Sequence, residues 1–191
     1  MNTTQPIRSK SQIRKLADYF LKIGQPRNHL LVVLGLNTAL RISDLLRLTW
    51  NDVYDFDNKR FRARIDIVEK KTRKAKSIIL NHSIKSALAI LFKQHAKEGA
   101  FLIENSRTKE AISRVQAYRI IRDASDALKF ENRVSCHSLR KTFGYQAWKS
   151  GTSPAVIMEI FNHSSLVVTR RYLGVTQDEK DAVYLSLDMT G

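Results

Sequence analysis

A histidine and a tyrosine stand nine residues apart in the stretch HSSLVVTRRY, at His163 and Tyr172. Arg170 and Arg171 directly precede the tyrosine, so its surroundings are strongly cationic. A phenol of pKa about 10 is a poor nucleophile at neutral pH, and positive neighbours would activate it. Because tyrosine is usually a half-buried packing residue, a reactive role for Tyr172 depends on what the rest of the chain supplies.

Two other segments place an arginine three residues from a possible partner. Arg41 and Asp44 are neighbours on a helix or across its first turn, so the carboxylate could fix the guanidinium, although a surface ion pair alone contributes little stability. His137 and Arg140 have the same spacing, in a segment whose other members look like core. An arginine beside a core face is normally there to bind an anion. Cys136 projects away from His137, which argues against a Cys-His nucleophile pair.

Positive charge is densest in the run KKTRKAK. This run falls on an expected hairpin tip, where cationic side chains can reach into a groove and bind phosphates without sequence preference. The candidates for such contacts are Lys70, Lys71, Arg73, Lys74 and Lys76.

The composition favours a nucleic-acid partner. With 33 lysines and arginines against 18 acidic residues, the 191-residue chain has a formal net charge of +15, which would attract a polyanion. No apolar run approaches the ~20 residues that span a bilayer, and the N-terminus has no signal-peptide core, so we expect a cytoplasmic protein without membrane contact. One cysteine and five scattered histidines give no support for a metal site.

Hydrophobic periodicity predicts a mainly α domain with a small antiparallel β-sheet of about three strands. A helical stripe over 13–20 is followed by the apolar run 28–40, which predicts a central helix. The period changes to two at 61–67, and with a last strand at 77–80 the sheet would lie within 52–80.

After the sheet the chain returns to helical spacing. Ser153 and Pro154 have the residue types of a helix N-cap and first turn, and Thr176 with Glu179 has the pattern of a capping box for a last helix. Further helices are expected from 83 toward Gly99 and over 115–128, 135–150, 153–161 and 164–172.

These segments together resemble the catalytic domain of the tyrosine recombinases, which include phage integrases and the Xer and Cre-type enzymes. The resemblance is carried by TALRISDLLRLTWNDV, a lysine on a strand turn, HSLRKTF and HSSLVVTRRYLG, in that order. It implies the DNA breaking-rejoining fold and one catalytic domain over 1–191, with a core at about 10–174 and a tail helix in 175–191 that could be exchanged between protomers. No N-terminal core-binding domain fits ahead of residue 10.

The resemblance also implies a function and a set of site residues. The chain would be a site-specific recombinase or integrase that cleaves and rejoins double-stranded DNA through a 3′-phosphotyrosyl intermediate, without metal, ATP or other cofactor. It would assemble on DNA as a dimer or tetramer through its tail and be associated with the nucleoid. The implied catalytic residues are Arg41, Lys71, His137, Arg140, His163 and Tyr172, with Asp44 as orienter of Arg41 and Lys70, Arg73, Lys74, Lys76 and Lys141 as DNA contacts.

Two residues depart from the pattern of these enzymes. The residue before the last histidine is usually glycine and here is Asn162, and the position after HSLR is often histidine and here is Lys141. Two other functions stay open on the sequence, a type IB topoisomerase-like nicking-closing enzyme and a non-catalytic DNA-binding domain. In the tail helix we expect Ala182, Val183 and Leu187 to face inward, either on a neighbouring protomer or on the body of the chain.

Overall fold

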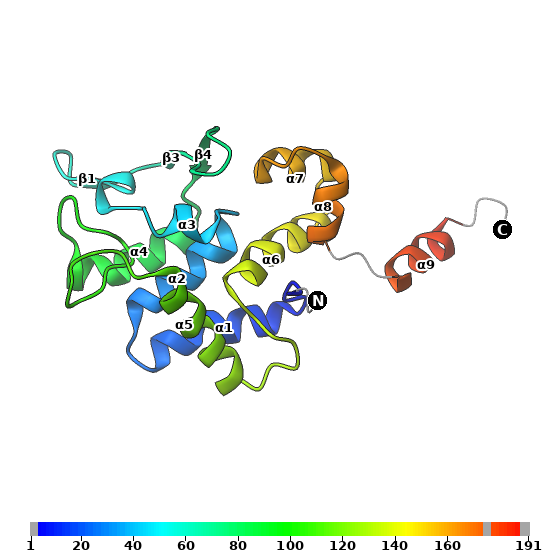
Figure 1. The fold of residues 1–191 in the computed structure, drawn as a ribbon, viewed down its shortest axis with the longest axis horizontal. Coiled ribbons are helices and arrows are strands. Elements are labelled where there is room, and N and C mark those ends of the chain that lie inside the picture. The colour runs from blue at the N-terminus through cyan, green and yellow to red at the C-terminus, as the bar shows by residue number, and fades with distance from the viewer. Residues whose placement is uncertain (1–3, 174–176, 188–191) are drawn as a thin grey trace.

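The computed structural model describes residues 4–173 and 177–187, and within them it is mainly helical (Figure 1). This confirms the predicted fold class, because the strands are few and short. The helices are α1 (Lys10–Lys22), α2 (Pro26–Asn37), α3 (Ile42–Leu45), α4 (His82–His95), α5 (Arg114–Ala127), α6 (Cys136–Lys149), α7 (Pro154–Phe161), α8 (Leu166–Leu173) and α9 (Gln177–Ser186), with a 3-10 turn η1 at Trp50–Asp52.

The strands form two separate two-stranded antiparallel sheets instead of one sheet of about three strands. β1 (Tyr54–Asp55) pairs with β2 (Arg60–Phe61), and β3 (Arg64–Val68) pairs with β4 (Ala75–Ile79). The alternating segment 61–67 is broken at a bend at Ala63. The backbone amide of Arg62 donates to the carbonyl of Val53, whereas the carbonyl of Ala63 accepts from the amide of Leu80. Hydrophobic alternation identifies the buried face of a strand and does not identify its neighbour.

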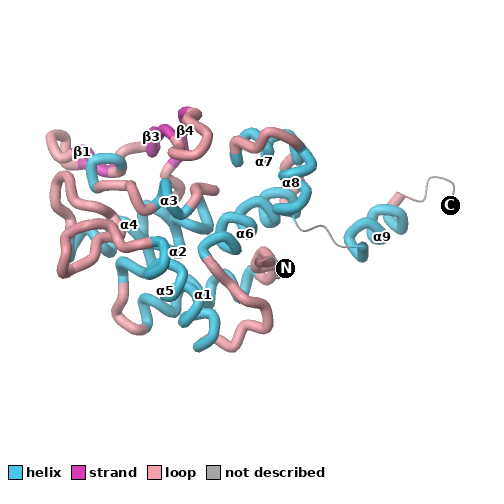
Figure 2. The backbone as a smooth tube through the Cα atoms, viewed as in Figure 1, coloured by secondary structure: helices cyan, strands magenta, loops and turns pink. Residues whose placement is uncertain are grey.

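The second helix lies at the centre of the main hydrophobic core, as its apolar sequence predicts. Leu30, Leu31, Val32 and Leu34 of α2 have no exposed surface, so the helix is buried on more than one face. Helices α1, α4 and α6 pack against it (Figures 1 and 2). The residue that follows this helix by four positions, Arg41, is therefore fixed by the core.

Two glycines allow α6 to pack closely on both sides. A Cβ atom added at Gly35 of α2 would stand 2.6 Å from Cδ1 of Leu139, and one added at Gly144 of α6 would stand 2.8 Å from the ring of Phe161. Such distances are closer than van der Waals contact allows, so a side chain at either position would force Leu139 or Phe161 to shift. Helix α6 is thus wedged between α2 and the α7–α8 pair, and this brings Arg140 close to segments from both.

Side-chain caps fix the starts of the helices around the site. Ser135 accepts from the amide of Ser138 and begins α6, and Ser153 accepts from the amide of Val156 and begins α7, with Pro154 in the first turn as predicted. Helix α7 ends at Asn162, which adopts the left-handed conformation with φ 51°. This turn redirects the chain from α7 toward α8 and its Tyr172.

The last described helix, α9, stands apart from the rest of the molecule (Figure 1). Val183 and Leu187 are 52% and 56% exposed. These two side chains therefore do not pack on the body of their own chain, which was one of the two arrangements expected from the sequence. The expected capping box begins at Thr176, which lies outside the described residues. In the part of the chain that the structure describes, no helix has the length and apolar character to cross a membrane.

Candidate active site

Five of the six side chains predicted as catalytic line a single cleft of 540 Å³. They come from four places in the fold: the α2–α3 connection, the β3–β4 turn, α6 and α8. The five are Arg41, Lys71, His137, Arg140 and Tyr172, and the cleft is completed by Leu40, Ile42, Ser43, Lys70, Arg114 and Cys136. The sixth, His163, lies directly behind Tyr172.

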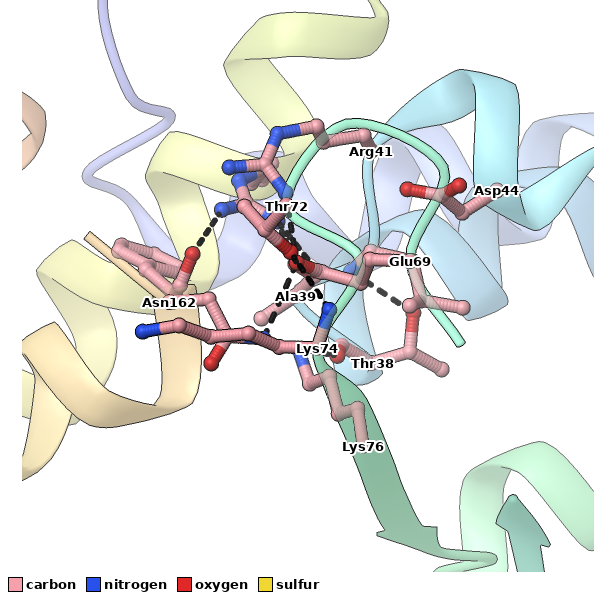
Figure 3. A network of polar contacts seen from close by, with 12 residues as sticks. Thr38, Ala39, Arg41, Asp44, Glu69, Thr72, Lys74, Lys76 and Asn162 are labelled. Carbon is pink, nitrogen blue, oxygen red and sulfur yellow. Dashed lines mark hydrogen bonds and ion pairs between the residues drawn. The ribbon is translucent and has the colours of Figure 1, made fainter. Parts of the chain in front are cut away.

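The two arginines converge on one buried carboxylate, that of Glu69. Nη1 of Arg41 donates to Oε2 of Glu69 at 2.8 Å (Figure 3), and Nη1 of Arg140 lies 4.0 Å from Oε1 of the same side chain. Two guanidinium groups that are 99 positions apart in the sequence, at 41 and 140, therefore face one anionic centre. Two positive charges against one carboxylate leave a net positive charge, which could balance the single negative charge of a phosphodiester.

Backbone carbonyls hold Arg140 in place. Its NH1 donates to the carbonyl of Ala39 and its NH2 donates to the carbonyl of Phe161 at 2.8 Å, while its guanidinium carbon lies 4.6 Å from the Phe161 ring centroid. Ala39 adopts φ 55°, a left-handed conformation that is strained for alanine and aims this carbonyl at the arginine. Burial, and next the charge of Arg41, lower the pKa of Arg140 to about 10, so this side chain is a cation at neutral pH.

Histidines flank the ring of Tyr172 on two sides. The centroid of the His137 ring is 4.9 Å from the tyrosine centroid, and that of His163 is 4.6 Å away, both edge-on. Nδ1 of His163 lies 3.1 Å from Oγ1 of Thr169, which fixes the orientation of the imidazole. The cation of Lys141 lies 5.7 Å from the tyrosine centroid. The phenol is therefore surrounded by groups that can take or give a proton.

The surroundings of both imidazoles favour the neutral form. Partial desolvation, followed by the charges of Lys141, Arg140 and Arg41, lowers the pKa of His137 to about 4. Desolvation and the same two arginines also lower the pKa of His163 to about 4. A neutral imidazole can accept a proton, whereas an imidazolium cannot, so the cations of the cleft keep both rings ready to act as bases.

The β3–β4 turn presents most of the predicted basic run to solvent. Lys70, Lys71, Arg73 and Lys74 are exposed at its tip. Lys76 differs from the expectation of a DNA contact: it points to the inner side of β4, and its Nζ donates to the carbonyl of Thr38 at 3.3 Å (Figure 3). Burial, and next the charge of Arg140, lower the pKa of Lys76 to about 8.

Two further predicted residues have partners other than those expected. Asp44 does not orient Arg41 in this structure: its Oδ1 accepts from the backbone amide of Lys70 at 2.9 Å, so it anchors the start of the basic turn instead. Lys141 is 8% exposed and donates to the carbonyl of Thr4 at 2.7 Å, which commits its ammonium group to the interior and not to a DNA-facing surface. Burial raises the pKa of the Cys136 thiol to about 11, so this cleft residue is protonated.

Sequence reasoning missed Glu69 and Arg114. Glu69 is fully buried, and the signal that could have found it is an acidic residue at the end of a strand directly before a run of cations. Arg114 lines the cleft from the start of α5, which no local motif indicates. Within residues 4–173 and 177–187, no three His, Cys, Asp or Glu side chains gather as a metal site would require.

The fold resembles the solved structures of two recombinases and one integrase. A XerA recombinase has a TM-score of 0.79 at 18% identity and matches 100% of this chain and 66% of that chain. XerH site-specific recombinase bound to palindromic difH substrate in a post-cleavage complex has a TM-score of 0.75 at 18% identity. The match covers 96% of this chain and 53% of the XerH chain. A lambda integrase dimer bound to a COC′ core site has a TM-score of 0.71 at 18% identity. The match covers 91% of this chain and 49% of the integrase chain. The fold is that of a tyrosine recombinase catalytic domain.

Residues 9–179 match the Phage integrase family, and the chain belongs to it. It is 38% identical over 184 residues to the probable integrase/recombinase YoeC of Bacillus subtilis (strain 168), covering 96% of this chain and 97% of that protein. It is 28% identical to a tyrosine recombinase of Pseudothermotoga lettingae, covering 91% of this chain but 58% of that protein. The chain thus spans nearly all of the first relative and a little over half of the second.

Proposed function

We propose that this chain is a site-specific DNA recombinase whose nucleophile is Tyr172. One observation carries the proposal: Arg41 and Arg140, which both pair with Glu69, line the same cleft as Tyr172. Two fixed cations can bind the non-bridging oxygens of a phosphodiester and stabilise the charge that develops on pentacoordinate phosphorus. In this cleft the two positive charges come from side chains of the protein itself.

In the cleavage step, the phenol oxygen of Tyr172 forms a bond to phosphorus while the bond from phosphorus to the 5′-oxygen breaks. The phenol proton passes to His137, whose neutral imidazole suits this role. His163 donates a hydrogen bond to a non-bridging oxygen. Lys71 gives a proton to the departing 5′-oxygen, so the products are a 3′-phosphotyrosine and a free 5′-hydroxyl, with atoms and charges balanced.

Rejoining is the reverse of this reaction with a second DNA end. A 5′-hydroxyl attacks the phosphotyrosine, the phenol leaves and recovers its proton, and the number of phosphodiester bonds is unchanged. The phosphotyrosine retains the energy of the broken bond, so the cycle requires no ATP. The exposed cations Lys70, Arg73 and Lys74 would bind the duplex backbone next to the cleaved phosphate.

Self-association on DNA is part of the proposal. Four large apolar side chains at α9 and directly after it are exposed. They are Val183 at 52%, Tyr184 at 80%, Leu185 at 84% and Leu187 at 56%. An apolar helix face that stands away from its own chain is suited to pack on a neighbouring protomer. A lambda integrase of this fold is a dimer on its DNA. Bound to DNA in this way, the protein would be found with the nucleoid.

The test is to trap the covalent intermediate. Purified protein is mixed with a pool of nicked duplexes whose sequences flanking the nick are randomised, and adducts that survive detergent are recovered and sequenced. We expect an adduct whose modified peptide contains Tyr172, and none with Tyr172→Phe. An adduct on Tyr184 would move the nucleophile to the tail, and binding without any adduct would favour the non-catalytic DNA-binding domain.

A second measurement separates a recombinase from a type IB topoisomerase-like enzyme. Relaxation of supercoiled DNA does not discriminate, because both activities relax it. Exchange of strands between two labelled duplexes that carry the recovered site does. We expect recombinant products, and nicking with resealing alone would favour the topoisomerase-like function.

A further inference from the structure

Glu69, at the end of β3, has partners in four other segments of the chain, and Figure 3 labels three of these partners, Arg41, Thr72 and Asn162. Its Oε2 accepts hydrogen bonds from NH1 of Arg41 at 2.8 Å, from Oγ1 of Thr72 at 2.7 Å and from Nδ2 of Asn162 at 3.0 Å. Its other oxygen, Oε1, faces Arg140 at 4.0 Å. One carboxylate therefore links the end of β3 to the α2–α3 connection, the basic turn, α6 and the end of α7.

Every one of these partners is a proposed catalytic residue or its neighbour in the chain. Arg41 and Arg140 are two of them. Thr72 directly follows Lys71, and Asn162 directly precedes His163. The position of Glu69 thus bears on both phosphate-binding cations, on the proposed general acid and on the histidine turn at once.

The carboxylate lies behind the wall of the cleft. Its side chain has no exposed surface and is not part of the cleft lining, whereas Arg41, 20% exposed, and Arg140, 2% exposed, both line the cleft. A bound phosphate would therefore meet the two arginines from the front while Glu69 holds them from behind. Desolvation alone would raise the pKa of Glu69, but hydrogen bonds from Thr72 and Asn162 and the charge of Arg41 outweigh it and lower the pKa, so the group is an anion.

The partner Asn162 supports the same role. Its left-handed conformation would suit glycine without strain, and a side chain there costs backbone energy. The asparagine amide provides what glycine lacks, a donor that joins the turn before His163 to Glu69. The strained residue is thus accounted for by a contact that reaches the centre of the site.

We infer that Glu69, together with Asn162, is a positioning residue that holds Arg41, the Lys71 turn and the His163 turn in the geometry required for cleavage. This inference rests on the proposed function and extends it to residues that do not touch the DNA. A misplacement of about 1 Å in a reacting group can slow a reaction on the order of 100-fold. The role should therefore appear in the rate of the bound complex more than in DNA affinity.

The experiment measures the rate of adduct formation at saturating DNA, and separately the DNA dissociation constant, on one duplex recovered from the pool. We expect Glu69→Gln to slow cleavage by about 10- to 100-fold with a change in dissociation constant of less than about threefold. Glu69→Asp, which keeps the charge, should recover part of the rate. Glu131→Gln removes an exposed carboxylate outside the cleft and should match the wild type.

Asn162→Gly provides a variant that should fold, because glycine adopts the left-handed turn freely. It should slow cleavage by about tenfold, and adding it to Glu69→Gln should slow the double variant by less than about twofold more, since both act through one hydrogen bond. Wild-type rates in Asn162→Gly, or equal losses of rate and affinity in Glu69→Gln, would overturn the inference while leaving Tyr172 as nucleophile. A wild-type chain that forms no adduct would instead overturn the proposed function itself.

Discussion

The imidazole of His163 meets the phenol ring of Tyr172 edge-on, with ring centroids 4.6 Å apart. The nine-residue interval of the sequence is thus closed into a direct contact by the turn that precedes α8. Thr169 holds the histidine through its Nδ1, so the position of the imidazole beside the proposed nucleophile is fixed by a second contact.

Stability should fall on mild acidification. His137 and His163 have pKa values of about 4 in the folded chain, well below their ordinary value, so the unfolded chain binds more protons. Their contribution is complete above about pH 6.5, the ordinary histidine pKa, and is lost as the pH falls toward 4. Urea unfolding midpoints measured between pH 7.5 and 5 should decrease, and the double variant His137→Asn, His163→Asn should decrease less. Parallel curves for the two proteins would contradict the assignment.

The cleavage rate lost on removal of the proposed general acid should be restored by a substrate with a better leaving group. Lys71→Ala should slow cleavage of ordinary DNA by about 100-fold or more, the range of general-acid catalysis. A substrate with sulfur in place of the 5′-bridging oxygen needs no proton on departure, so it should restore the rate of Lys71→Ala. The same substrate should give no such recovery with Lys70→Ala or Lys74→Ala, and recovery in either would move the acid to that lysine.

The exposed tip of the β3–β4 turn should account for much of the salt dependence of DNA binding. Each phosphate contact contributes about 0.9 to the slope of log affinity against log salt. The triple variant of Lys70, Arg73 and Lys74 to alanine should therefore reduce the slope by about 2 to 3 in a fluorescence anisotropy titration. A matched triple variant on the exposed face of α1, at Arg14, Lys15 and Lys22, removes the same charge and should leave the slope nearly unchanged.

A methyl group at the α6–α7 contact should damage both stability and activity. Gly144→Ala places a Cβ 2.8 Å from the Phe161 ring and should cost about 1 to 3 kcal/mol of unfolding free energy, as overpacked cores do. It should also slow cleavage, because Phe161 immediately precedes Asn162 and His163. Gly151→Ala meets nothing within 4 Å and has only backbone strain, so it should lose about 1 kcal/mol and cleave normally. Equal effects of the two variants would show that packing at Gly144 is unimportant.

The tail should be required for assembly and not for cleavage. A chain that ends at residue 174 retains every residue of the cleft, so it should still form the tyrosyl adduct on a suicide substrate. It should fail to form the slower-migrating complexes in which several protomers share DNA, as seen by gel shift and light scattering. Unchanged assembly by the shortened chain would exclude the proposed exchange of α9.

The sequence predicted the members of the site better than the contacts among them. Arg41, Arg140 and Tyr172 were predicted from motifs, and the structure brings all three to one cleft. The orienter of Arg41 could not be predicted in the same way, because Asp44 is near in sequence while Glu69 is near in space. Local spacing defines which side chains share a helix face, and only the tertiary fold defines which strand end meets that face.

The helices and strands show the same difference between local features, which the sequence predicted, and tertiary contacts, which it did not. Helix α2 was predicted as central because apolar residues surround it, and α7 was predicted with its cap and its first proline. The sheet was not predicted correctly, since β2 and β3 are separated by a bend at Ala63, and the backbone hydrogen bond from Arg62 to Val53 leaves no hydrophobic signal. Lys76 was predicted to contact DNA, whereas it points to the inner side of β4. The reason is related, because the sequence of a cationic run does not indicate which of its side chains points inward.

The bond between Arg140 and the carbonyl of Ala39 joins residues that are 101 positions apart. During synthesis, neither this contact nor the approach of Tyr172 can form until nearly the whole chain has left the ribosome. Under the proposed function, a nascent or prematurely terminated polypeptide therefore has basic surfaces that could attract DNA but lacks the tyrosine that would cleave it. If Tyr172 is the nucleophile, the order of synthesis means that an incomplete copy of the enzyme could not break DNA.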